Sequence, residues 1–285
     1  MGFELETLGN KEFLRITDGD TPFVSMPIRM LSIDTPEVHY PGNQAPSKHD
    51  EKLAQLADWI REGVAPVRSD LGRYLYPRLK TGEAGTLQGR QGASAAARLN
   101  ELIEEKLTRP SGKRRSVYLR SANEPFDSYG RLLAYMAPNY SKKERSSMTR
   151  REMATFNLLM VESGWAASFL IYPNLPRHLD LVLLQESAMA AYDEKRGAWA
   201  EPLMLTGYEF RMCVRLYDIT KKLASKEKLG TGEKEVWIER FCVDMTTQKI
   251  FYPQDYYRVL PYNRIFVWPK DVADAVERMN LLTSE

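Results

Sequence analysis

Residues 29–37 read RMLSIDTPE, a short apolar strand that leads directly into polar residues. Arg29 stands at its start, and Asp34 and Glu37 stand at its end on either side of Pro36. An arginine can bind a phosphate through two parallel hydrogen bonds, whereas carboxylates suit a hard cation or accept a proton. Side chains alternate between the faces of a strand, so this one must end, bulge or twist before Asp34 if Arg29 and Asp34 are to act together. The stretch predicts a β-rich fold with a phosphate-directed site.

Two further polar clusters in the first half of the chain carry the same residue types. Residues 18–21 read DGDT, and residues 127–131 read DSYGR. Each cluster taken alone is typical of a turn between strands. Taken together with Arg29, Asp34 and Glu37, they supply what cleavage of a phosphodiester requires: carboxylates for a divalent cation, guanidinium groups for the phosphate and a carboxylate that activates water.

The order and spacing of these clusters resemble the staphylococcal nuclease (thermonuclease) family. The similarity continues through GASA at residues 92–95, GWA at residues 164–166 and a last helix at residues 186–199. It covers residues 10–202 apart from an insertion. The fold that the resemblance implies is α+β, a five-stranded β-barrel of the oligonucleotide-binding (OB) type with packed helices.

The resemblance implies a calcium-dependent nuclease. Asp20, Asp34 and the backbone carbonyl of Thr35 would bind Ca²⁺, and Glu37 would be the base that activates water. The implied reaction is hydrolysis of DNA, RNA or both, with products that end in 3′-phosphate. The alternative is a catalytically inactive module that binds nucleic acid or serves as a scaffold. Retention of all the site residues favours the enzyme, because degenerate copies of such a site usually lack at least one.

The same resemblance implies the residues that hold the substrate. Arg29 and Arg131 would grip the phosphate. Tyr129 falls where the family contacts a substrate phosphate, and Tyr172 falls near its nucleotide-contacting tyrosines. Ser128 stands where the family often has a lysine for a terminal phosphate, so the resemblance does not imply recognition of a chain end.

The other elements of residues 1–202 are predicted from periodicity and turn signals. They are a hairpin within residues 13–33, strands near 117–119 and 132–136, and helices near 95–107, 149–164 and 181–196.

An insertion at about residues 38–91 has no counterpart in the minimal nuclease. We expect an amphipathic helix between Ser47 and Gly63, followed by a long loop from Pro66 to Gly92. The insertion leaves the chain directly after Glu37, and long loops in compact domains are usually functional. It is therefore expected to form a wall or lid beside the site.

Residues 203–285 form a C-terminal extension that we expect to be a small antiparallel sheet ending in a helix. Alternating apolar residues predict a strand from Glu209 to Tyr217. Further strands are predicted at residues 236–243, 249–252 and 257–268, and a helix at 271–282. Its basic and acidic residues nearly balance, so the extension is not a nucleic-acid arm, and recruitment of a protein partner is a possible role.

The composition is that of a globular protein with a mild charge. The 285 residues include 40 Lys and Arg against 38 Asp and Glu, too even a balance to attract a polyanion by bulk charge. Cys213 and Cys242 lack metal-type spacing and are expected to be buried thiols of a reducing compartment. No apolar run approaches the ~18 residues that cross a bilayer, and the start lacks signal-peptide features, so we expect a cytoplasmic protein with no membrane partner.

Overall fold

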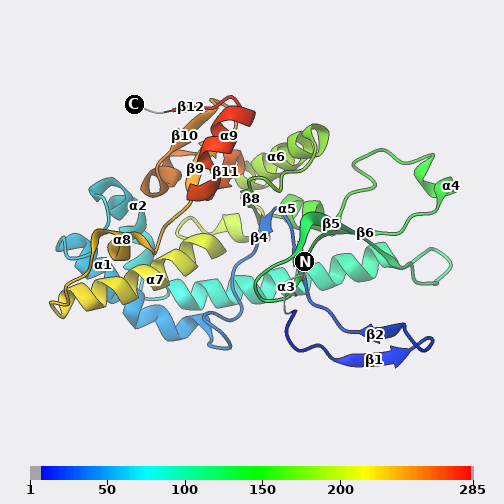
Figure 1. Cartoon of the computed structure of the whole chain (residues 1–285), viewed down its shortest axis with the longest axis horizontal. Helices are drawn as coiled ribbons and strands as arrows, with labels where there is room; N and C mark the ends of the chain where they lie inside the picture. The colour runs from blue at the N-terminus through cyan, green and yellow to red at the C-terminus, as the bar shows by residue number, and fades with distance from the viewer. Residues whose placement is uncertain (1–7, 284–285) are drawn as a thin grey trace, which may run out of the picture. The chain divides into compact units, whose positions relative to one another are not determined.

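The computed structural model describes residues 8–283, a mixed α+β protein (Figure 1). The chain divides into two compact units. Unit 1 contains the residues up to Leu31 together with Glu104–Asn157, and unit 2 contains Ser32–Ile103 together with the residues from Leu158 onward. No described helix has the length and apolar character that a membrane crossing demands.

Unit 1 contains a hairpin and a three-stranded sheet. Strands β1 (Phe13–Ile16) and β2 (Pro22–Val24) pair antiparallel around the DGDT turn, which confirms the predicted hairpin. The sheet has the order β3 (Ile28–Met30), β6 (Leu132–Pro138) and β5 (Val117–Phe126), with β3 parallel and β5 antiparallel to β6. The strands predicted near residues 117–119 and 132–136 are therefore confirmed, and a short helix, α4 (Lys142–Arg145), follows them.

The strand that opens the site motif breaks between Arg29 and Asp34. Strand β3 ends at Met30, Ser32 adopts a φ of 61°, and β4 (Ile33–Asp34) pairs instead with β7 (Ala167–Ser168). A positive φ is uncommon for a residue with a side chain and marks a sharp change of chain direction. The required break before Asp34 is thus present.

Helices make up most of unit 2. Its helices, wholly or in part, are α1 (Asp50–Arg61), α2 (Ser69–Leu79), α3 (Ala84–Leu107), α5 (Phe156–Glu162), α6 (His178–Asp193), α7 (Gly207–Ala224), α8 (Thr231–Glu235) and α9 (Val272–Arg278). Those predicted at residues 47–63, 95–107, 149–164, 181–196 and 271–282 are confirmed with shifted ends. The Thr149–Glu152 capping box forms, although its residues lie in a turn before α5.

The insertion is helical where a long loop was predicted. Helix α2 and the first turns of α3 occupy the stretch from Pro66 to Gly92. Leu71, Leu75 and Leu79 recur at helical spacing and are fully buried in α2, although Pro77 lies inside that helix. The Gly, Pro and Arg content of the stretch conceals this spacing in the sequence.

The insertion and the C-terminal extension share one hydrophobic core. Leu53 and Leu56 of α1 and the α2 leucines belong to the same buried cluster as Phe210, Met212 and Leu216 of α7. Trp237 and Tyr256 of the extension are also part of this cluster and are fully buried. Helices α1 and α7 pack side by side (Figure 1). The expectation of a lid is therefore wrong, since the insertion braces unit 2, whereas a wall beside the site stays a prediction.

The extension begins with helix α7, so the strand predicted from Glu209 to Tyr217 is wrong. A capping box starts the helix, because Thr206 Oγ1 accepts from Glu209 N and the Glu209 carboxylate accepts from Thr206 N. The alternating apolar residues are buried, but so are Cys213, Tyr217 and Ile219. A helix buried on most of its circumference includes an alternating subset, and this subset produced the false strand pattern.

The sheet of unit 2 contains both parallel and antiparallel strand pairs. The prediction of a purely antiparallel sheet for the extension is therefore wrong. Its order is β12 (Leu282–Thr283), β10 (Lys249–Phe251), β9 (Phe241–Asp244), β11 (Arg264–Val267) and β8 (Leu170–Ile171). Strand β9 runs antiparallel to both neighbours, whereas β11 is parallel to β8 and β10 is parallel to β12. The strands predicted at residues 236–243 and 257–268 are shorter than expected. A turn after α8 occupies the start of the first, and 3₁₀ turns at Pro253–Arg258 and Pro261–Asn263 occupy the start of the second.

The described strands form four separate sheets, of two, five, three and two strands, and none of these closes into a barrel. The five-stranded OB barrel thus stays a prediction. Cys213 and Cys242 are buried free thiols, as expected.

Candidate active site

The predicted site residues are divided between the two units. Unit 1 holds Asp20, Arg29, Tyr129 and Arg131, and unit 2 holds Asp34, Thr35, Glu37 and Tyr172.

In unit 1, adjacent strands bring the two arginines of the site together. Arg29 lies in β3 opposite Leu133 of the parallel strand β6, and Arg131 stands two residues before Leu133. Leu132 N donates to Pro27 O at 2.9 Å and extends this pairing to the start of both strands. Residues two apart in an extended chain share a face, so both arginines start from the same side of the sheet.

A tight turn orients Arg131. Asp127 Oδ1 accepts from Tyr129 N at 2.9 Å and from Arg131 N at 3.0 Å, while Asp127 Oδ2 accepts from Arg131 Nε at 2.7 Å. Burial raises the pKa of Asp127, but its hydrogen bonds with Arg131 outweigh burial and leave that pKa below its usual value. Gly130 has a φ of 69°, and a Cβ there would lie 2.1 Å from Leu8 O, so the turn requires glycine.

Two other groups of unit 1 are open to solvent. Tyr129 is 79% exposed, and the centre of its ring lies 5.3 Å from the Arg131 guanidinium carbon. Asp20 is exposed in the turn between β1 and β2, where its Oδ1 accepts from Thr21 Oγ1 at 3.1 Å. Both side chains are therefore accessible to a ligand.

In unit 2, Asp34 and Glu37 lie at the end of β4. Asp34 is only 2% exposed and is paired through its backbone with Ala167 of β7. Helix α3 holds the backbone of Glu37 through the side-chain amide of Gln88. In the orientation that satisfies both neighbours, the amide oxygen accepts from Glu37 N at 2.8 Å and the amide nitrogen donates to Leu205 O at 3.0 Å. A Cβ on Gly92 would lie 2.6 Å from Glu37 O, so the close approach of this helix depends on glycine.

Arg211 of α7 binds both carboxylates. Its Nη2 donates to Asp34 Oδ1 at 3.0 Å, and its Nη1 donates to Glu37 Oε1. Burial alone lowers the pKa of Arg211, but the negative charges of Asp34 and Glu37 raise it above its usual value. The guanidinium therefore stays charged and joins the two acidic residues of the motif in one network.

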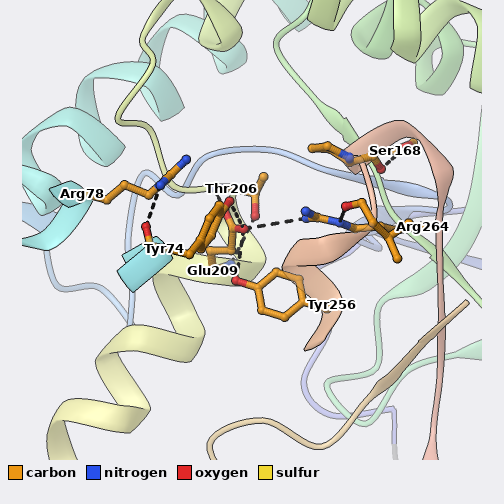
Figure 2. A network of polar contacts seen from close by, with 9 residues as sticks. Tyr74, Arg78, Ser168, Thr206, Glu209, Tyr256 and Arg264 are labelled. Carbon is orange, nitrogen blue, oxygen red and sulfur yellow. Dashed lines mark hydrogen bonds and ion pairs between the residues drawn. The ribbon is translucent and has the colours of Figure 1, made fainter. Parts of the chain in front are cut away.

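A buried polar network anchors the start of α7 (Figure 2). Glu209, which is 2% exposed, accepts hydrogen bonds from Tyr74 Oη at 2.9 Å and Tyr256 Oη at 3.1 Å. Its Oε1 also lies 3.7 Å from Nη1 of the buried Arg264. These contacts tie α7 to α2 and to β11, two residues before Arg211 in the same helix.

The first residue of α7 packs directly on the candidate ligands. A Cβ on Gly207 would lie 2.3 Å from Thr35 O and 2.7 Å from Asp34 Oδ2. Only glycine allows the helix to come this close. The N-terminus of a helix carries a partial positive charge, which favours the nearby carboxylate.

The oxygen donors have the chemistry that Ca²⁺ prefers. Asp34 and Thr35 offer a carboxylate and a carbonyl, and Asp20 offers a second carboxylate in unit 1. Within the described residues, however, three or more His, Cys, Asp or Glu side chains never gather in a way that could hold a metal ion. The donor types fit calcium, while Arg211 already binds one oxygen of Asp34.

Tyr172 is placed differently from the other site residues. It is 6% exposed, and its hydroxyl donates to Asp274 Oδ2 of α9. That contact and, to a lesser degree, burial raise the pKa of Tyr172. A buried ring with a partnered hydroxyl is poorly suited to contact a nucleotide.

Three residues of this site escaped prediction: Gln88, Gly207 and Arg211. Gln88 and Gly207 act through backbone contacts that leave no pattern in the sequence. Arg211 lies 174 residues after Glu37, within a stretch whose alternating apolar residues predict a strand. The available signals were the capping-box spacing of Thr206 and Glu209 and a charged residue inside an apolar run.

Comparison with known proteins identifies the family of the chain. The family model described as staphylococcal nuclease homologue matches residues 27–201, which include Arg29, Asp34, Glu37 and Arg131. No curated protein matches the chain in sequence. Since the family model spans more than half of the chain, the chain belongs to the staphylococcal nuclease homologue family.

Proposed function

We propose that the protein is a calcium-dependent nuclease that hydrolyses phosphodiester bonds of DNA, RNA or both. One observation carries the proposal. The residues matched to the nuclease family contain two arginines of unit 1, one in β3 and one directly before the adjacent strand β6, and two carboxylates of unit 2 that Arg211 joins. These residue types are those that attack on a phosphodiester requires.

Glu37 is the proposed base. Its side chain is 24% exposed, so a water molecule can approach it, and Gln88 and Gly92 fix its backbone. The carboxylate takes a proton from this water as the oxygen attacks phosphorus. The 5′-oxygen of the next nucleotide departs, and the product ends in 3′-phosphate.

Arg29 and Arg131 are the proposed phosphate ligands. A guanidinium can give two hydrogen bonds to nonbridging oxygens and stabilise the charge that builds as the bond breaks. Asp127 binds Nε and Nη2 of Arg131 and so orients its guanidinium, while Nη1 has no hydrogen-bond partner in the part of the chain that the structure describes. The exposed Tyr129 beside it is placed to contact the substrate.

Asp20, Asp34 and the carbonyl of Thr35 would hold Ca²⁺. The bound ion would supply positive charge beside the phosphate. The proposal includes an OB-type barrel for residues 1–202 and a DNA or RNA substrate. Both are inferred from membership of the family.

A cleavage assay tests the proposal. The purified protein is incubated with end-labelled single- and double-stranded DNA and RNA, in Ca²⁺, in Mg²⁺ or in excess chelator. We expect cleavage in Ca²⁺, none in chelator, and fragments that a 3′-phosphatase converts to 3′-hydroxyl ends. Binding without cleavage under every condition would identify an inactive nucleic-acid-binding module, and full activity in chelator would contradict the role of calcium.

A further inference from the structure

The acidic pair Asp34 and Glu37 already has a cation, which the protein itself supplies. Arg211 bridges the two residues with separate nitrogens, so the two carboxylates share one guanidinium, which offsets one of their two negative charges. The side chains of Asp34 and Arg211 are 1% and 21% exposed. Charges this far from water need a partner, and the ion pair supplies one with two charge-assisted hydrogen bonds.

The start of α7 covers the same oxygens that the family resemblance assigns to calcium. Gly207 leaves no room for a side chain between the helix and the carbonyl of Thr35 or Oδ2 of Asp34. The positive end of the helix and the guanidinium one turn later thus face one acidic site. This second observation concerns the backbone and is independent of the Arg211 side chain.

The helix that carries Arg211 is firmly held. Glu209, two residues earlier, is buried and bonded to Tyr74, Tyr256 and the backbone of Thr206 (Figure 2). Beyond Arg211, Met212 and Cys213 are fully buried. The packing of α7 in the core of unit 2 therefore fixes the position of Arg211 beside Asp34 and Glu37.

We propose that Arg211 is the resident cation of the Asp34–Glu37 site, and that Ca²⁺ binds at Asp34 in competition with it. Only the identity of the competing ion rests on the proposed function. Each carboxylate gives one oxygen to Arg211, and a divalent ion that draws on Asp34 must weaken this bond or displace the guanidinium. The C-terminal extension then sets the calcium affinity of a site whose other residues belong to the nuclease family.

Calcium titration of variants tests the competition. Wild type, Arg211→Gln and Arg211→Lys are treated with chelator, dialysed and titrated with CaCl₂ by isothermal calorimetry. We expect Arg211→Gln to bind Ca²⁺ at least ten-fold more tightly than wild type. Arg211→Lys should gain less, because an ammonium keeps the charge but does not bridge two carboxylates as a planar fork does.

Thermal unfolding gives a second readout that does not depend on activity. Without calcium, Arg211→Gln should unfold at a lower temperature than wild type, because Asp34 and Glu37 lose the guanidinium of Arg211. Calcium should restore most of this difference while shifting wild type little. One combined result would overturn the proposal: Arg211→Gln stays unfolded in millimolar calcium, and Arg211→Lys binds calcium only as tightly as wild type. Calcium and the guanidinium would then not be interchangeable.

Arg215→Gln is the matched control. Arg215 lies on the same helix one turn later and is exposed. The proposal is wrong if Arg215→Gln gains as much calcium affinity as Arg211→Gln, since the effect would then be one of general charge. It is also wrong if the affinity of Arg211→Gln is unchanged or weaker, or if neither it nor wild type binds calcium.

The cleavage assay is scored separately. Wild-type cleavage with no gain in calcium affinity in Arg211→Gln overturns the competition and leaves the nuclease standing. A gain in calcium affinity in Arg211→Gln, with no cleavage by wild type or any variant, supports the competition and contradicts the nuclease activity.

Discussion

Nη2 of Arg211 lies 3.0 Å from Oδ1 of Asp34, although 177 residues separate the two in sequence. Asp34 lies in the part of the chain that matches the nuclease family, whereas Arg211 lies beyond it. The same helix contributes Phe210, Met212 and Leu216 to the core of unit 2. The residues after 202 are therefore built into the unit that holds Asp34 and Glu37. Whether they also recruit a protein partner stays a prediction.

Glu37→Gln should lower the rate of phosphodiester cleavage by about 10² to 10⁴, the usual contribution of an acid–base group. Glutamine keeps the shape of the side chain but accepts no proton. The rate is measured under single-turnover conditions with the nucleic acid that wild type cuts best.

Glu227→Gln serves as the control, because Glu227 is exposed in the loop after α7. Its cleavage rate should equal that of wild type. Wild-type turnover in Glu37→Gln would mean that another group activates the water.

Arg29→Lys and Arg131→Lys should each strongly reduce cleavage while the protein stays folded. Lysine keeps the charge but loses the bidentate fork, and at position 131 it also loses the Nε contact to Asp127. Cleavage rates and circular dichroism are compared with those of Arg120→Lys, an exposed arginine on β5 of the same sheet. If all three variants cut alike, the phosphate assignment fails.

Much of the fold could be predicted because its signals are local. The polar clusters, the hairpin, strands β5 and β6 and the helix that begins at Asp50 all follow from spacing and turn residues over a few positions. Helix α7 could not be predicted in this way. It is buried on most of its circumference, so its apolar residues satisfy a period of two as well as a period of 3.6.

The sequence predicts the candidate site residues that stand in short motifs, but not those that come from distant elements. Asp34 and Glu37 stand in a short motif, whereas their partner Arg211 comes from a distant helix whose placement depends on the packing of the whole unit. Burial likewise decides the place of Tyr172, since the sequence shows a tyrosine before a proline but does not show Asp274 beside its hydroxyl.

Glu209→Gln should destabilise unit 2 by about 3 to 5 kcal/mol, the usual cost of removing one partner from a buried ion pair. The substitution leaves Arg264 buried without its carboxylate and disturbs the hydroxyl groups of Tyr74 and Tyr256. Urea unfolding followed by tryptophan fluorescence measures the loss.

Glu233→Gln is the matched control for this loss. Glu233 caps the exposed helix α8 by accepting from Gly230 N at 2.8 Å. It has the same capping position as Glu209 without the burial, so its replacement should change stability little. Equal losses in the two variants would show that capping, and not the buried pair, is what matters.

Stability should fall as the pH rises above about 9. Burial raises the pKa of the Cys242 thiol from 9.0 to about 12 and that of the Tyr208 phenol from 10.0 to about 12. Each group holds its proton more tightly in the folded state than in the unfolded state. Its contribution to the free energy of unfolding is therefore fully present below the unfolded pKa and is lost as the pH rises through the folded pKa.

Urea unfolding at several pH values between 8 and 11 checks this alkaline loss. Tyr208→Phe removes one of the buried groups that titrate in this range, so its unfolding free energy should decline less steeply than that of wild type. Parallel pH profiles for the two proteins would show that the Tyr208 phenol is not responsible.

Tyr208→Phe and Tyr256→Phe should change stability at pH 7 in opposite directions. The two rings lie perpendicular with centres 5.7 Å apart, and both side chains are buried. The Tyr208 hydroxyl has no hydrogen-bond partner in the described part of the chain, whereas that of Tyr256 donates to Glu209. Removing an unpartnered buried hydroxyl should stabilise the fold by about 1 kcal/mol, and removing a donor to a carboxylate should cost about 1.5 to 3 kcal/mol. Urea unfolding of both variants measures the signs directly. A loss in Tyr208→Phe as large as that in Tyr256→Phe would instead place a buried water on the Tyr208 hydroxyl.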